Sequence, residues 1–161
     1  MASKLWEKNV QVDHDVERYT VGRDREMDLY LAPYDVLGSM AHITMLQSIG
    51  LLTAEELDTL TAELRNIYDE IEHGRFTIEE GVEDVHSQVE LMLTRRLGDM
   101  GKKIHSGRSR NDQVLVDLRL FIRSKIEEVV VAMTRLFKTL QAQSERYSQV
   151  LMPGYTHLQV A

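Results

Sequence analysis

The feature that most constrains the fold of this chain is the stretch from Asp112 to about Val150, which contains neither glycine nor proline. Its apolar residues recur in alternating steps of three and four, the spacing of one face of a helix. This face comprises Leu115, Leu118, Ile122, Ile126, Val129, Met133, Leu136 and Leu140, with Val114, Phe121, Val130 and Phe137 on an adjoining face. The pattern predicts one continuous helix about 55–60 Å long. Because such a rod has two apolar faces, we expect partner subunits and further sequence to cover it.

Composition and charge narrow the class of protein. The chain has 161 residues, 43% of them hydrophobic, which is enough for one ordinary core. The absence of cysteine excludes disulfides and thiolate chemistry. A net charge of -7 argues against a nucleic-acid partner or an anionic membrane surface. No apolar run reaches the length of a membrane span, and residues 1–9 lack the hydrophobic stretch of a signal peptide, so we expect a cytoplasmic protein.

Shorter helices are predicted before the long one. The first covers residues 36–49, after start signals at Pro33 and Asp35, and the second begins with a capping box at Thr53 and Glu56. Each ends at a glycine. The segments before the first helix and directly before the long helix are expected to be loops.

A third short helix is predicted within TIEEGVEDVHSQVELMLTRRLG. A second capping-box pattern lies at Thr77 and Glu80, and the apolar spacing continues past an interruption at Gly81. Asp84 and His86 then lie at or near a helix start, where they could be an N-cap and its exposed neighbour or parts of a site. No β-type alternation of useful length occurs, so the predicted fold class is all-α.

The densest group of chemically useful side chains is KKIHSGRSRND, residues 102–112. Its four cations are Lys102, Lys103, Arg108 and Arg110. Gly107 lets the backbone turn before the long helix, whose N-terminus favours an anion that an arginine can grip through two N–H groups. In a simpler interpretation, Asn111 or Asp112 is only an N-cap and the cations lie in solvent. A nucleic-acid loop is disfavoured, because no aromatic residue is interleaved for stacking.

Four stretches, in their order and spacing, resemble the argininosuccinate lyases, a family of the fumarase/aspartase superfamily. They are DVLGSMAH at 35–42, EDVHSQVE at 83–90, GRSRNDQV at 107–114 and GYTHLQ at 154–159. The resemblance extends over the chain from Asp35 onward. GRSRNDQ followed by GYTHLQ is specific for this family, since fumarases, aspartases and adenylosuccinate lyases differ at one or both stretches.

The resemblance implies a fumarase/aspartase-type N-terminal helical domain over residues 1–111. Residues 112–161 would form the first long helix of the central bundle and the start of a Thr-His loop. It also implies reversible β-elimination of argininosuccinate to arginine and fumarate, a step of arginine biosynthesis that uses no metal or organic cofactor. Members of the family are homotetramers whose sites are each assembled from three subunits.

The resemblance also assigns the site residues. His157 would take part in proton transfer, and the substrate-binding residues would be Asn111, Thr156, Ser109, Arg110, Asp84 and His86. The reaction places a second negative charge on the carboxylate beside the carbon that loses its proton, so cations and oriented N–H groups are what it needs.

The chain departs from the family pattern in three respects, the smallest of which is Val160 in place of a common arginine after THLQ. Asp24 aligns where the family has a substrate-contacting serine, and the family's downstream Ser-Ser-x-Met-Pro-x-Lys-x-Asn loop is absent. We therefore expect the chain to be a fragment that is inactive alone. Two other functions stay open at this point: a lyase for another succinyl-type substrate, and a non-catalytic assembly module similar to the lens crystallins of this fold.

Overall fold

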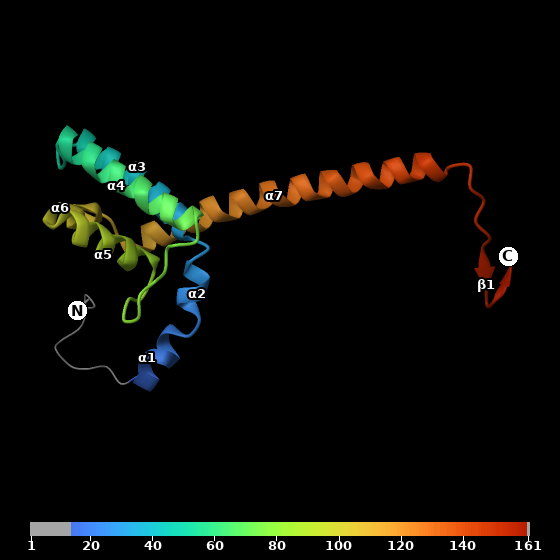
Figure 1. Ribbon diagram of the computed structural model, residues 1–161, viewed down its shortest axis with the longest axis horizontal. Helices are drawn as coiled ribbons and strands as arrows, with labels where there is room; N and C mark the ends of the chain where they lie inside the picture. The colour runs from blue at the N-terminus through green and yellow to red at the C-terminus, as the bar shows by residue number, and fades with distance from the viewer. Residues whose placement is uncertain (1–13, 161) are drawn as a thin grey trace. The chain divides into compact units, whose positions relative to one another are not determined.

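The computed structural model describes residues 14–160 and is mainly helical in that range, with almost no strand (Figure 1). The helices are α1 (His14–Val21), α2 (Asp24–Asp28), α3 (Ala32–Ser48), α4 (Ala54–Glu72), α5 (Val85–Leu97), α6 (Asp99–Lys102), the 3-10 helix η1 (Lys103–His105) and α7 (Arg110–Tyr147). The strands β1 (Tyr155–Thr156) and β2 (Gln159–Val160) follow. The predicted all-α class is confirmed. The signal-peptide argument drawn from residues 1–9 lies outside the described range.

The chain divides into two compact units, Met1–Ile122 and Arg123–Ala161. We call them the N-terminal unit and the C-terminal unit. Helix α7 is continuous and contributes its first turns to the N-terminal unit and the rest to the C-terminal unit. Each unit is described separately below.

The core of the N-terminal unit lies between α3, α4 and α5, with α3 and α4 side by side (Figure 1). Its fully buried side chains include Val36, Ile43, Leu46, Leu60, Leu64, Ile67, Val85, Val89, Leu93 and Ile104. Along α3, α4 and α5 they recur in steps of three, four or seven residues, so each of these helices buries a single face. Among the described residues, the hydrophobic core includes no side chain from α7.

The capping box predicted for the second short helix is confirmed at the start of α4. The Glu56 N–H donates to Thr53 Oγ1 at 3.1 Å, and the Thr53 N–H donates to Glu56 Oε2 at 3.0 Å. Helix α3 begins at Ala32, four residues before the predicted start, because Pro33 occupies its first turn. Asp35 lies in that first turn but is buried, and its carboxylate contacts α5 and α7 instead of capping α3.

The second predicted capping box, at Thr77 and Glu80, is wrong, because helix α5 begins only at Val85. Two observations explain the difference. The Glu79 N–H donates to Gln88 Oε1 at 3.0 Å, and Gly81 has a φ of 85°, which a helix does not accommodate. Asp84 is the actual N-cap, with its Oδ1 accepting from the Ser87 N–H at 2.8 Å.

Two segments expected to be loops contain short helices. Helices α1 and α2 precede α3, and α6 and η1 fill the segment between α5 and α7. Gly101 in α6 is tightly packed, since a Cβ there would overlap the backbone of Leu93. These pieces are one or two turns long, and helices this short depend on tertiary packing that a periodicity argument does not include.

The predicted long helix is confirmed as α7, 38 residues from Arg110 to Tyr147. The whole of α7 lies in the described range, and its buried residues are Gln113 and Asp117, whereas its apolar stripe is exposed. No helix within residues 14–160 combines the length and hydrophobicity needed to cross a membrane.

Candidate active site

The first turn of α7 is capped by Ser109. Ser109 Oγ accepts from the Asn111 N–H at 3.2 Å, and the Ser109 N–H donates to Asp112 Oδ2 at 3.3 Å. The interpretation of Asn111 or Asp112 as the N-cap is therefore wrong by a few residues, because the hydroxyl of Ser109 takes that place. Asn111 and Ser109 are exposed at this helix end, where the positive end of the helix dipole favours an anion.

Arg110 joins the start of α7 to the start of α5. Its Nη1 donates to Asp84 Oδ2 at 2.8 Å, and its Nη2 donates to Ser87 Oγ at 2.7 Å. Glu83 Oε2 lies further away, at 3.5 Å from Nη1. Asp84 thus caps α5 with one oxygen and holds Arg110 with the other. This contact brings the starts of α5 and α7 together, and with them three predicted site residues: Asp84, Ser109 and Arg110.

The other cations of the basic segment also have partners, so they are not simply solvated. Lys102 pairs with Asp99 at 2.7 Å, and Lys103 contacts Glu56. Arg108 is directed inward, where its two terminal nitrogens lie 3.3 and 3.4 Å from Ser39 Oγ. Burial lowers the pKa of Arg108, and the charge of Asp35 opposes that shift.

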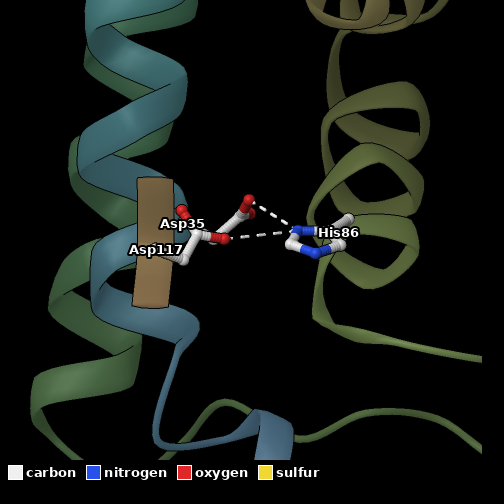
Figure 2. A group of neighbouring side chains, drawn as sticks. All are labelled: Asp35, His86 and Asp117. Atoms are coloured by element: carbon white, nitrogen blue, oxygen red, sulfur yellow. Dashed lines mark hydrogen bonds and ion pairs between the residues drawn. The ribbon is translucent and has the colours of Figure 1, made fainter. Parts of the chain in front are cut away.

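Behind this surface lies a buried polar cluster of Asp35, His86 and Asp117, from α3, α5 and α7. Figure 2 shows both carboxylates facing the imidazole of His86. His86 Nδ1 lies 2.8 Å from Asp35 Oδ1 and 3.7 Å from Asp117 Oδ2. Asp35 and Asp117 are 0% exposed and His86 is 3% exposed, so the interpretation of His86 as an exposed neighbour of the cap is wrong.

The cluster retains protons that exposed groups would lose. Burial raises the pKa of Asp117 to about 7, with a further increase from the charge of Asp35 and an opposing effect of His86. Burial disfavours the imidazolium of His86, but the hydrogen bond to Asp35 and the carboxylate charges around it outweigh burial and raise the pKa of His86. The geometry therefore suits an imidazolium between two carboxyl groups that share negative charge.

The same three residues could in principle offer a metal ion one nitrogen and two carboxylate oxygens, all within 4.8 Å of one another. The surroundings favour a proton instead. The 2.8 Å separation of His86 Nδ1 and Asp35 Oδ1 is a hydrogen-bond distance. In addition, the Gln113 amide donates to the same Asp35 oxygen, and the charge of Arg108 acts on both carboxyl groups.

Gln113 completes the cluster, since its Nε2 donates to Asp35 Oδ1. Several buried acceptors here have no hydrogen-bond partner among the described residues: Asp35 Oδ2, Gln113 Oε1 and both carboxylate oxygens of Asp117. An unpaired buried oxygen is costly when ionised, which agrees with the proton-holding character of Asp117.

Thr156 and His157 belong to the C-terminal unit and form part of its hairpin. Tyr155 pairs with Val160 and Thr156 with Gln159, which leaves His157 and Leu158 as a two-residue loop. Both loop residues have positive φ, 50° and 66°, as in the type I′ turns that favour asparagine and glycine. Thr156 and His157 are exposed.

The predicted site residues Asp84, His86, Ser109, Arg110 and Asn111 lie in one unit. The contacts of Ser87 and Gln113, and the pairing of Asp35 and Asp117 with His86, were not predicted. A usable signal existed for two of them. Gln113 and Asp117 are polar residues four positions apart, on the side of the helix away from the stripe that begins at Leu115 and Leu118.

The chain resembles known proteins over its whole length. A family model described as "Lyase" matches residues 7–161. Argininosuccinate lyase of Parabacteroides distasonis is 76% identical over 161 residues, which are all of this chain and 36% of that protein. The enzyme of Bacteroides thetaiotaomicron is 74% identical over the same share. That of Methylococcus capsulatus is 46% identical over 98% of this chain and 34% of its own length. The chain thus spans about a third of the curated relatives it matches.

Proposed function

Since this chain belongs to the lyase family matched over residues 7–161, we propose that the full-length protein is an argininosuccinate lyase. The observation that carries the proposal is 74–76% identity, over every residue of the chain, to relatives that bear this name. The reaction breaks the bond between the guanidino nitrogen and the succinyl carbon. A base takes the proton from the adjacent carbon, the electron pair forms the double bond of fumarate, and the guanidino group leaves as arginine after it receives a proton.

The start of α7 supplies what this elimination needs at the substrate carboxylate. Charge accumulates there when the proton leaves, and the exposed helix N-terminus at Ser109 and Asn111 stabilises an anion. Arg110 lies directly beside this turn, and Asp84 and Ser87 hold its guanidinium in place. The turn is therefore organised before substrate arrives.

We propose the residue roles that the resemblance to the argininosuccinate lyases implies. His157 takes part in proton transfer, and the groups assigned to substrate binding are Asn111, Thr156, Ser109, Arg110, Asp84 and His86. His86 is buried in the N-terminal unit against Asp35 and Asp117, so its effect on substrate would be indirect.

The remaining proposals concern the assembly. We propose a homotetramer in which α7 forms part of a central bundle, supported by the exposed apolar stripe of α7. We place the boundary between the N-terminal helical domain and the bundle at residues 111 and 112, and propose that no cofactor takes part. The cytoplasmic location stays a prediction.

The test is turnover by the purified full-length protein. Argininosuccinate is supplied, and fumarate is followed by its ultraviolet absorbance while arginine is quantified separately. Equal release of both products supports the proposal. No release from argininosuccinate, with release of fumarate from another succinyl compound, would replace it by the alternative substrate class.

A further inference from the structure

The first turns of α7 contact the other helices of the N-terminal unit through polar side chains on one face, beside an edge contact between the rings of Phe121 and Tyr34. Arg110, Gln113 and Asp117 follow a spacing of three and four residues, so they share one stripe of the helix. Along α7, all of which is described, the buried residues are Gln113 and Asp117. Its large apolar side chains, such as Leu115 and Leu118, are exposed. This is the reverse of the usual amphipathic helix, which buries its apolar face.

A single oxygen atom joins three helices at this attachment. Asp35 Oδ1, on α3, lies 2.8 Å from His86 Nδ1, on α5, and also accepts from Gln113 Nε2, on α7. Asp117 lies one turn further along α7, with its Oδ2 3.7 Å from the same imidazole nitrogen. All four side chains are buried.

Directional contacts of this kind determine the position of a helix more narrowly than apolar packing does. A hydrogen bond weakens steeply when its distance or angle changes, whereas apolar side chains tolerate sliding. A rotation of α7 by one residue would carry Gln113 away from Asp35. The same rotation would move Ser109 and Asn111, at the exposed start of the helix.

We propose that Gln113 and Asp117, together with Asp35, are positioning residues for the anion-binding turn at Ser109–Asn111. They set the rotation and axial position of α7 so that this turn keeps a constant place relative to Asp84 at the start of α5. The inference rests on the proposed function, since it assigns these residues to the lyase site. None of the three contacts substrate.

In the Asp35–Gln113 contact an amide donates to a carboxylate, so the proposal can be tested by swapping these two groups between the two positions. Gln113→Glu places a second carboxylate against Asp35 and removes the donor. Asp35→Asn in the Gln113→Glu background restores the pair in reverse, since the amide introduced on α3 donates to the new carboxylate and its oxygen still accepts from His86. The two changes together keep one carboxylate and one amide at the same place.

In the full-length protein we expect Gln113→Glu to lower kcat by about tenfold or more with a smaller effect on KM, because the turn is misplaced for the transition state. Adding Asp35→Asn should recover most of that loss. Hydrogen–deuterium exchange of peptides spanning 106–117 should rise in Gln113→Glu and return toward the original rate in the double variant. Asp117→Leu should give the same kinetic pattern as Gln113→Glu.

The matched control is Leu64→Ala, which removes a fully buried side chain of α4 outside the cluster. It should lower the thermal midpoint at least as far as Gln113→Glu does and leave kcat within about twofold. Kinetic losses that follow the thermal midpoint across all variants, or a double variant no better than Gln113→Glu, would overturn the proposal. Failure of the unchanged protein to cleave argininosuccinate would instead refute the proposed function, and the exchange measurement would still report whether the contact positions the turn.

Discussion

At the scale of single residues, the side chains at the start of α7 have two different surroundings: some are exposed to solvent, and others are bound to the start of α5. Asn111 is exposed, and its backbone N–H is already bound by Ser109 Oγ at 3.2 Å. Its side chain is thereby held at the end of a helix whose first turn is ordered. Arg110 faces the other way and donates to Asp84 and Ser87, so it fixes the position of the turn relative to α5.

Replacing the exposed groups should affect the reaction and leave the fold intact. We expect Asn111→Ala and His157→Asn in the full-length protein each to reduce fumarate release by about a hundredfold, as for groups that position substrate or transfer protons. Asn66→Ala is the matched control, since Asn66 is exposed on α4 and its amide donates to the nearby Glu63 at 3.1 Å. Near-normal turnover of both site variants would remove the assignment.

Asp117 should make stability depend on pH in a defined direction. Its carboxyl has a pKa raised from 3.8 to about 7, so the folded chain binds this proton more tightly than the unfolded chain. That stabilisation is complete below the unfolded pKa and is lost as the pH rises toward the folded pKa. His86 adds to the trend, because its pKa is also raised and its favourable contribution disappears above its ordinary value of 6.5.

The contribution of Asp117 is measured by comparing the free energy of unfolding in urea of the chain and of the Asp117→Asn variant across pH. The free energy of unfolding of the chain, relative to the variant, should fall between about pH 4 and pH 7. The charged and titratable groups around Asp117 are Asp28 of α2, Asp35 of α3, His86 of α5 and Arg108 of the loop before α7. They remain in both proteins, so their own titration largely cancels. Parallel curves for the two proteins would show that Asp117 does not retain its proton.

At the scale of elements, each helix of the core is delimited by a local signal and fixed by a buried stripe. Helix α4 has both, a complete capping box at Thr53 and Glu56 and the fully buried Leu60, Leu64 and Ile67. Helix α5 also begins at a side-chain cap, Asp84. Because Asp84 binds Arg110 as well, this one side chain caps α5 and orients the start of α7.

The cap of α4 provides an independent measure of how much a local signal contributes. Thr53→Ala removes the acceptor of the Glu56 N–H and should lower the free energy of unfolding by about 1 kcal/mol. Thr59→Ala, within the same helix, removes only a hydroxyl that donates to the Glu55 carbonyl at 2.9 Å and should change it by less than about 0.5 kcal/mol. Equal effects of the two substitutions in chemical denaturation would mean that the box contributes nothing beyond an ordinary hydroxyl.

At the scale of the whole molecule, the stripe of α7 is a long exposed apolar surface within residues 14–160. Val129, Met133, Leu136 and Leu140 are each more than half exposed, at 60%, 60%, 52% and 60%. Continuous apolar surface of this kind is rare on a protein that stays monomeric. Association through α7 is therefore the expected way to bury it.

We expect the chain to sediment as an oligomer at micromolar concentration, and Val129→Glu with Leu136→Glu to convert it to a monomer. The control is Ser124→Glu with Ala142→Glu, which adds the same charge. Ser124 and Ala142 lie about two and a half helical turns from Met133, on the opposite face. A monomer before any substitution, or equal dissociation by both pairs, would contradict assembly through the stripe.

The sequence by itself determined the helices whose signals are local. The extent of α7 followed from the absence of breakers and a sustained three-four spacing, and the start of α4 followed from its capping box. The resemblance of GRSRNDQ and GYTHLQ to one family also depended only on residues adjacent in the chain. Such features need no knowledge of which segments meet, because every interaction involved lies within one or two turns.

Only the tertiary structure decided which polar residues meet. Asp35 and Gln113 are 78 positions apart and share one hydrogen bond, and His86 joins them from a third helix. Their sequence neighbourhoods suggested a helix start and an exposed cap neighbour, since burial is a property of packed helices and not of a local pattern. The same reason explains the failure at Thr77, where a capping-box pattern was present but Glu79 is held by Gln88 and by Arg95 at 2.9 Å. Contacts between distant segments outweighed a local preference of about 1 kcal/mol.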